Sequence, residues 1–218
     1  MDEHDNRATA QIMSYVLRES SGCLDVGAHE GGLLRHMERL APKGRHHAFE
    51  PLPHCAASLR THFPQVTVHE AAASDEAGEA EFHHVVSDPG WSGLRRRTYH
   101  RQGVRVDVIR VRTCRIDDTI PESEQIDFIK VDVEGAELQV LRGAVETLLR
   151  CRPYVVFEHG RGAAEHYGTT PEMVHRLLVD DCGLAIFGLD GAGPWSAAEF
   201  VAVFREGRRW NFLARPYR

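Results

Sequence analysis

Acidic side chains follow several apolar segments of this 218-residue chain. In α/β proteins, residues that directly follow the strands border the ligand-binding crevice. Asp25 ends the segment CLD, and Glu50 follows HHAF. Asp132 follows IDFIKV, and Glu158 follows PYVVF. If these segments are neighbouring parallel strands, their carboxyl ends meet at one edge of a sheet. Carboxylates gathered there could accept protons, hydrogen-bond sugar hydroxyls or hold a divalent cation.

The pattern of the whole chain predicts the scaffold that would bring these residues together. Strand-like runs alternate with helical patterns: CLDVGA precedes GLLRHMERL, HHAFEP precedes residues 54–63, VTVHEAAAS follows, IDFIKVDVEG precedes ELQVLRGAVETLL, and PYVVFEHG precedes PEMVHRLLVDD. This alternation favours an α/β fold with a parallel sheet covered by helices on both faces. Apolar spacing also predicts a leading helix over residues 6–19, and the tail GLAIFGLD, SAAEFVAVFREG, RRWNFLARP indicates strand, short helix, strand.

The stretch CLDVGAHEGG, residues 23–32, joins the first predicted strand to a helix. Glycines there leave room for a ligand against backbone N–H groups, and a helix N-terminus favours an anionic group. Glu50, which stands 19 residues after Gly31, could accept hydrogen bonds from both ribose hydroxyls. The GxGxxG spacing of dinucleotide folds is missing. The order Asp25-Val-Gly27-Ala-His-Glu-Gly31 resembles motif I of class I S-adenosylmethionine-dependent methyltransferases.

A longer stretch, IDFIKVDVEGAELQVLRGA (residues 126–144), resembles the most characteristic segment of the FkbM family of methyltransferases. DVGAHEG, FEP, AAASDEAGEAEF, VRTCRIDD, VVFEHG and WNFLARP match the family in the same order. The resemblance runs from about Cys23 to Pro216 and is weakest over residues 83–110 and 160–179. It implies a Rossmann-like class I methyltransferase fold, with a seven-stranded, mostly parallel sheet in the order 3-2-1-4-5-7-6, an antiparallel last strand and helices on both faces.

The resemblance also implies which residues would hold the donor, S-adenosylmethionine. The first three strand ends and the turns after them are assigned to it. The predicted donor-binding residues are Asp25, Gly27, Ala28, His29, Gly31, Glu50, Pro51, Ala72, Ala73 and Ser74.

One segment, residues 78–119, interrupts the alternation with strand-like runs separated by turn residues. We expect a β-rich insertion between the third and fourth core strands of a single domain, residues 1–218, whose first 21 residues contain the leading helix. The insertion would cover the acceptor site as a lid. Its basic run LRRRTYHRQGVR, from Arg95 to Arg105, is either a solvated loop or an attractor for an anionic acceptor. Trp91 could stack on a ring of that acceptor.

Alternation along IDFIKVD places Lys130 and Asp132 on one face of a strand that should be buried. Such residues need a function or a partner, so the alternative to catalysis is a structural ion pair, either between themselves or with Arg142. A hydroxyl acceptor must lose its proton during methyl transfer. The predicted catalytic residues that could serve this step are Lys130, Asp132, Glu134, Glu158 and His159, and direct base catalysis is the first hypothesis.

A metal ion is the second hypothesis for removing that proton. Asp132 and Glu158 would end adjacent strands, and carboxylate oxygens suit Mg²⁺ or Ca²⁺. A bound ion would lower the pKa of the acceptor hydroxyl.

The sequence thus predicts an S-adenosylmethionine-dependent methyltransferase acting on a hydroxyl of a sugar, polyketide or other small secondary metabolite. An N-methyltransferase acting on an amine and a non-catalytic nucleotide-binding module with the same fold stay open as alternatives. A dinucleotide oxidoreductase is disfavoured by the missing glycine spacing.

The charge and composition of the chain exclude some classes of binding partner. A formal net charge of -6 is not that of a dedicated nucleic-acid binder. No apolar run approaches the ~20 residues that span a bilayer, and MDEHDNRAT lacks the basic start and apolar core of a signal peptide. The five cysteines show no CxxC pairing, which suits a reducing compartment. We expect a cytoplasmic protein with a small-molecule acceptor, and a homo-oligomer stays open.

Overall fold

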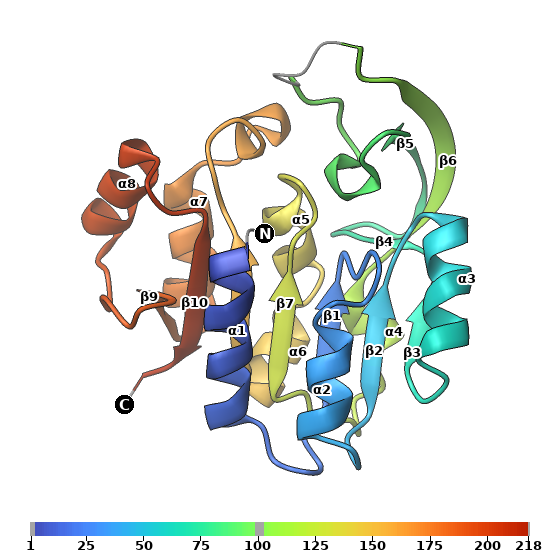
Figure 1. The fold of residues 1–218 in the computed structure, drawn as a ribbon. Helices are drawn as coiled ribbons and strands as arrows, with labels where there is room; N and C mark the ends of the chain where they lie inside the picture. The colour runs from blue at the N-terminus through green and yellow to red at the C-terminus, as the bar shows by residue number, and fades with distance from the viewer. Residues whose placement is uncertain (1–2, 99–102, 218) are drawn as a thin grey trace.

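A computed structural model describes residues 3–98 and 103–217. At its centre is a seven-stranded sheet in the order β3-β2-β1-β7-β8-β10-β9 (Figure 1). Its strands are β1 (Cys23–Val26), β2 (His46–Phe49), β3 (Thr67–His69), β7 (Phe128–Val131), β8 (Tyr154–Glu158), β9 (Leu184–Gly188) and β10 (Asn211–Pro216). Counted among themselves, these strands follow the expected order 3-2-1-4-5-7-6. β10 pairs antiparallel with β8 and β9, as predicted.

Helices cover both faces of this sheet (Figure 1). On one face, α1 (Glu3–Val16), α2 (Leu34–Leu40) and α3 (Pro53–His62) contribute apolar side chains such as Met13, Met37 and Leu59 to one core. On the other, α5 (Glu137–Arg142), α6 (Val145–Cys151), α7 (Pro171–His175) and α8 (Ala197–Glu206) surround a second core. The remaining helices are η1 (Pro89–Trp91), α4 (Ile116–Thr119), η2 (Ala164–Tyr167) and η3 (Arg176–Asp181). Within the described ranges, every helix is too short or too polar to cross a membrane.

The predicted insertion forms a second, three-stranded sheet in the order β4-β6-β5. β5 (Gly78–Val85) and β6 (Val106–Cys114) pair antiparallel, and β4 (Ala72–Ala73) runs parallel to β6. In Figure 1 this hairpin stands above the carboxyl ends of β1 and β2. Arg101 of the predicted basic run lies outside the described residues.

Two predicted elements are divided in the structure. VTVHEAAAS was expected to be one core strand, but only Thr67–His69 joins the central sheet and Ala72–Ala73 pairs with β6 instead. ELQVLRGAVETLL was expected to be one helix, but it breaks at Gly143 into α5 and α6. A Cβ on Gly143 would stand 2.0 Å from the carbonyl oxygen of Ser74, so the two segments meet where a side chain has no room. Tertiary contact therefore overrides local helical periodicity.

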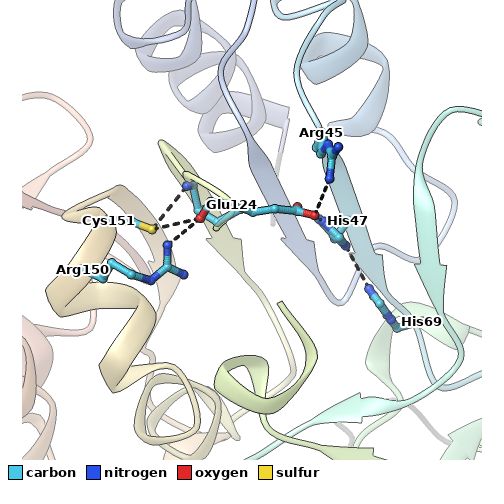
Figure 2. A network of polar contacts seen from close by, with 7 residues as sticks. Arg45, His47, His69, Glu124, Arg150 and Cys151 are labelled. Carbon is cyan, nitrogen blue, oxygen red and sulfur yellow. Dashed lines mark hydrogen bonds and ion pairs between the residues drawn. The ribbon is translucent and has the colours of Figure 1, made fainter. Parts of the chain in front are cut away.

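A polar network links β2 and β3 to the segment that precedes β7 (Figure 2). The carboxylate of Glu124 accepts hydrogen bonds from Arg45 at 3.0 Å and from His47 at 2.8 Å, and His47 is 3.1 Å from a ring nitrogen of His69. The backbone oxygen of Glu124 accepts from Arg150 at 2.6 Å. Glu124 thus ties β2 and β3 to α6.

Replacing Glu124 should test this network through the pH dependence of stability. Burial would raise the pKa of Glu124, but the bonds from His47 and Arg45 hold it below its ordinary value. A lowered pKa stabilises the fold above the unfolded value of about 4.3 and loses that effect as pH falls through the folded value. Glu124→Gln should cost about 1.5 kcal/mol at pH 7 in urea denaturation. The difference from wild type should shrink below about pH 4.

Glu70→Gln is the matched control, because Glu70 pairs with Arg60 at 2.9 Å but both side chains are more than 40% exposed. Its cost should stay below about 0.5 kcal/mol. Equal costs for the two variants would contradict a special contribution from the Glu124 network.

Candidate active site

The turn after β1 lies directly against the turn after β7. A Cβ on Gly27 would stand 1.9 Å from the carbonyl oxygen of Asp132, and Gly27 has φ +78°, so only glycine fits. The backbone N–H groups of Gly27 and Ala28 donate to the carbonyl oxygen of Phe49 at 3.0 and 3.2 Å. The turn is thereby held between β2 and β7. The close approach brings the predicted donor turn and the predicted catalytic residues into one site.

Glu50 fixes the other side of the same turn. Its carboxylate is buried, and its two oxygens accept from the backbone N–H groups of His29 at 2.8 Å and Leu52 at 2.9 Å. Burial raises the pKa of Glu50, although both hydrogen bonds lower it. Because each carboxylate oxygen has a second lone pair, Glu50 keeps acceptor capacity for a ligand hydroxyl.

Lys130 places a buried ammonium group between two carboxylates. Asp25 and Lys130 are opposite each other in the β1–β7 register. The Nζ atom of Lys130 lies 3.6 Å from an oxygen of Asp25, 3.6 Å from an oxygen of Asp132, and 3.0 Å from the carbonyl oxygen of Gly27. Burial would lower the pKa of Lys130, but Asp132 and Asp25 raise it above its ordinary value. Lys130 therefore stays charged, and its ion pairs make it a poor proton acceptor.

Three carboxyl groups gather beside this ammonium. One oxygen each from Asp132, Glu134 and Glu158 lies within 4.8 Å of the other two. Burial and the charge of Asp132 raise the pKa of Glu158 well above its ordinary value. Burial would raise the pKa of Asp132 too, but Lys130 and a hydrogen bond from Glu158 hold it well below its usual range. As pH rises, Asp132 therefore loses its proton before Glu158 does, and the proton in their shared hydrogen bond belongs to Glu158.

The same three residues include the predicted metal pair, Asp132 and Glu158. Hard carboxylate oxygens suit Mg²⁺ or Ca²⁺. Cationic side chains already contact two of the carboxylates, however, because Lys130 lies beside Asp132 and the guanidinium of Arg97 donates to Glu134. An ion would have to displace these contacts. The metal stays a prediction from the sequence.

The structure does not bring every predicted residue to this site. The predicted catalytic role of His159 must be corrected, because its ring lies under α8 and stacks on Phe204 at 4.7 Å and on Phe200 at 5.9 Å. Adjacent residues at a strand end point to opposite faces, so His159 turns away from Glu158. Burial lowers the pKa of His159 to about 4. The histidine is neutral and is not placed to act as the base.

Two predicted donor residues also have packing roles instead. A Cβ on Gly31 would meet the ring of Phe63 at 2.4 Å, so Gly31 lets α3 pack against the turn. Ser74 donates to its neighbour Asp75 at 3.2 Å and lines a separate groove behind the insertion.

Apart from Glu158, which borders neither of them, the other predicted residues line two adjoining cavities. The inner pocket is narrow, about 60 Å³, and is bordered by Gly27, His29, Glu50, Pro51, Ala72, Ala73, Asp132 and Glu134, among others. The outer groove, about 390 Å³, is bordered by Asp25, Gly27, Ala28, His29, Lys130, Asp132 and Glu134, among others. Because both are bordered by Gly27, His29, Asp132 and Glu134, the two cavities adjoin at the carboxyl edge of the sheet.

The insertion was expected to cover the acceptor site, and it adds Asp88 and Trp91, the predicted stacking residue, to the outer groove. Sequence reasoning missed its contribution to the inner pocket, which consists of Phe82, Pro89, Gly90, Ser92 and Leu94. The leading helix adds Asn6 to the groove. The turn signal DPGW was visible in the sequence. The sequence did not show which residues this turn contacts, because those residues are far away along the chain.

Comparison with known proteins gives consistent matches. A family model described as the methyltransferase FkbM domain matches residues 25–184. The 2-O-methyltransferase NoeI of Sinorhizobium fredii is 35% identical over 157 residues, which cover 65% of this chain and 65% of NoeI. The chain therefore aligns with slightly less than two thirds of that relative.

Solved structures share the fold. Methyltransferase FkbM from Methylobacillus flagellatus has a TM-score of 0.57 and 19% identity, over 95% of this chain and 47% of that one. The plantazolicin methyltransferase BamL, solved with a triazolic desmethylPZN analogue and S-adenosylhomocysteine (SAH), has a TM-score of 0.51 and 10% identity, over 99% of this chain and 87% of that one. At these identities the resemblance is one of architecture.

Removing the charge of Lys130 should test the buried ion pairs. Lys130→Met leaves Asp25 and Asp132 close together without a cation, so unfolding in urea at pH 7 should need about 3 kcal/mol less. In the variant the pKa of each carboxyl group should rise, and protonation then removes their repulsion. The deficit should therefore narrow as pH is lowered from 7 to 5.

Lys43→Met provides the control, since Lys43 pairs with Glu19 where both side chains are at least 70% exposed. It should change stability by less than about 0.5 kcal/mol. A deficit for Lys130→Met that is as small as this, or independent of pH, would show that the buried charge is not needed.

Proposed function

The chain belongs to the FkbM family of methyltransferases, and on that premise we propose that it transfers a methyl group from S-adenosylmethionine to a hydroxyl of a small molecule. The observation that carries the proposal is that two features border the same pair of adjoining cavities. These are the glycine turn fixed by Glu50 and the carboxylates of Asp132 and Glu134, and an oxygen of Glu158 lies within 4.8 Å of an oxygen of each of these two acids.

The shape of that space supports the choice of donor. Glu50 would accept hydrogen bonds from the ribose with its remaining lone pairs, and the apolar walls of the inner pocket would hold the adenine between Ala72 and Phe82. Asp25 is 1% exposed and borders the outer groove, and its Oδ1 lies 3.6 Å from the ammonium of Lys130. A carboxylate oxygen has more than one lone pair, so Asp25 would also accept a hydrogen bond from the ammonium group of a methionine moiety in the groove.

The narrowness of the inner pocket has a consequence for binding. Its outer wall consists of insertion residues, Phe82, Pro89 and Leu94, whereas its inner wall belongs to the central sheet. An adenosine would need the insertion to move outward by a small amount. The insertion is thus proposed to close over the donor as well as to border the acceptor.

Asp132 is the proposed base. When bound, the donor supplies a methyl group on a sulfonium, which leaves as the neutral thioether when the acceptor oxygen attacks in line. Asp132, ionised by its contact with Lys130, would accept the hydrogen bond of the acceptor hydroxyl and direct its lone pair. The proton passes to the Asp132–Glu158 pair and then to water. Positioning contributes more than basicity, because a low pKa makes Asp132 a weak proton acceptor.

Charge favours a hydroxyl over an amine as the acceptor. The outer groove is bordered by Glu30, Asp88, Asp132 and Glu134, so a nearby amine would be held in its protonated form without a free lone pair. The name of NoeI, a 2-O-methyltransferase, agrees with oxygen methylation. We propose a neutral polyhydroxylated acceptor, such as a sugar or polyketide, that could stack on Trp91.

An anionic acceptor is supported less well than a neutral one. Arg97 already pairs with Glu134, and Arg105 pairs with Asp107 at 2.9 Å. These insertion arginines are therefore partly neutralised. A cytoplasmic setting also belongs to the proposal, and the five cysteines, all free, would suit it.

Calorimetric titration with SAH, with NAD run in parallel, tests the donor assignment. Wild type should bind SAH with micromolar affinity and NAD not detectably. Glu50→Ala should weaken SAH binding 10- to 100-fold, because the ribose acceptor and the support of the turn are both lost. Absence of SAH binding, or an affinity indifferent to Glu50, would reject the proposal and favour a non-catalytic module.

Radiolabelled methyl transfer then tests the acceptor. A panel of neutral sugars, uronic acids and primary amines should show incorporation into the neutral hydroxyl compounds only. Parallel reactions with EDTA or added Mg²⁺ address the metal prediction. Glu70→Ala, which changes an exposed acid outside both cavities, is the matched control for Glu50→Ala.

A further inference from the structure

Glu137 is a buried carboxylate with no place in the proposed chemistry. It is the first residue of α5 and is 2% exposed, and it is absent from the described walls of both the inner pocket and the outer groove. One of its oxygens, Oε1, accepts from the backbone N–H of Val133 at 3.2 Å and from that of Gly135 at 3.0 Å. The turn between β7 and α5 is therefore folded around this side chain.

That turn has an unfavourable backbone conformation. Glu134 has φ +61° and Gly135 has φ +108°. A non-glycine residue in the left-handed region costs on the order of 1 kcal/mol and persists only where its surroundings enforce it. On its outer side the turn meets another segment, since a Cβ on Gly135 would stand 2.6 Å from the carbonyl oxygen of Ala163 and 2.9 Å from the ring of Tyr167. Glu137 holds it from within.

The turn also carries two of the three clustered carboxylates. Asp132 precedes Val133, and Glu134 lies between the two N–H groups that Glu137 binds. Any rotation of the turn would redirect both side chains. Keeping Glu137 there is costly, because burial raises its pKa to about 7 even though the backbone N–H groups lower it. A helix start alone could be capped by a neutral residue at lower cost.

We infer that Glu137 is a positioning residue: by holding the turn between β7 and α5, it aims Asp132 and Glu134 at the place where the methyl group is transferred. The inference rests on the proposed function. It identifies a residue outside the cavity that determines where the side chains of Asp132 and Glu134 point.

Two donor analogues can read the direction of the carboxylates without a known acceptor. Sinefungin carries a charged amine where the sulfonium methyl of the donor stands, whereas SAH carries nothing there. The ratio of their dissociation constants therefore reports how well carboxylates face the methyl position. Both would be titrated calorimetrically into wild type, Glu137→Ala, Glu137→Gln and Asp117→Ala.

Asp117→Ala is the matched control for Glu137→Ala, because it too removes a buried carboxylate that accepts from two backbone N–H groups, although Asp117 also contacts the hydroxyl of Thr147 and the guanidinium of Arg115. The buried carboxylate of Asp117 accepts from the backbone N–H groups of Glu146 at 3.1 Å and Thr147 at 2.9 Å, at the start of α6. Loss of either carboxylate should lower the melting temperature to a similar extent. Only Glu137 touches the turn that carries the acid cluster.

Wild type should bind sinefungin at least about tenfold more tightly than SAH. Glu137→Ala should abolish this preference while changing the affinity for SAH by less than about threefold, and Asp117→Ala should change neither. Glu137→Gln should restore the preference to within about threefold of wild type, because both backbone bonds go to one oxygen that the amide retains.

The inference is overturned if Glu137→Ala keeps the preference for sinefungin, or if it weakens both ligands equally, as a general loss of structure would. A wild-type protein that binds both analogues without preference also overturns it, because the carboxylates would then not face the methyl position. A wild-type protein that binds neither analogue rejects the proposed function instead, so the two failures are distinguishable.

Discussion

The ammonium group of Lys130 is the interaction on which the site depends. It lies between Asp25 and Asp132, at the junction of β1 and β7, the two neighbouring strands from which the donor turn and the acid cluster arise. Burying three ionisable groups in one place is costly unless opposite charges are close. Lys130 meets that condition and leaves Asp132 ionised.

The charge of Lys130 also separates the protonation states of two neighbouring carboxyl groups. The ammonium lies 3.6 Å from Asp132 and lowers the pKa of that carboxyl group, whereas burial and the charge of Asp132 raise the pKa of Glu158. One carboxylate can therefore accept a hydrogen bond while the next donates one. The adjacent strand ends β7 and β8 make this possible by bringing Asp132 and Glu158 together.

Gly27, Glu50 and Glu137 fix the two turns that form the site. Gly27 lets the turn after β1 touch the carbonyl of Asp132, where any larger residue would separate the strands. Glu50 and Glu137 each use a buried carboxylate to hold backbone N–H groups, one in the turn after β1 and one in the turn after β7. Carboxylates thus have two separate tasks at this edge of the sheet: some face the cavity, and others fix the backbone that presents them.

The sequence by itself determined the α/β fold, the strand order and the glycine turn after β1, because alternation, glycine spacing and the family motifs are local patterns that can be recognised without knowledge of contacts. It also placed Asp132, Glu134 and Glu158 at strand ends. Only the tertiary structure decided that His159 turns under α8, that Gly31 makes room for Phe63, that Ser74 lines a different groove, and that the insertion forms part of the wall of the inner pocket. The physical reason is that a side chain's direction and protonation depend on neighbours distant in sequence, such as Lys130 for Asp25 and Arg97 for Glu134.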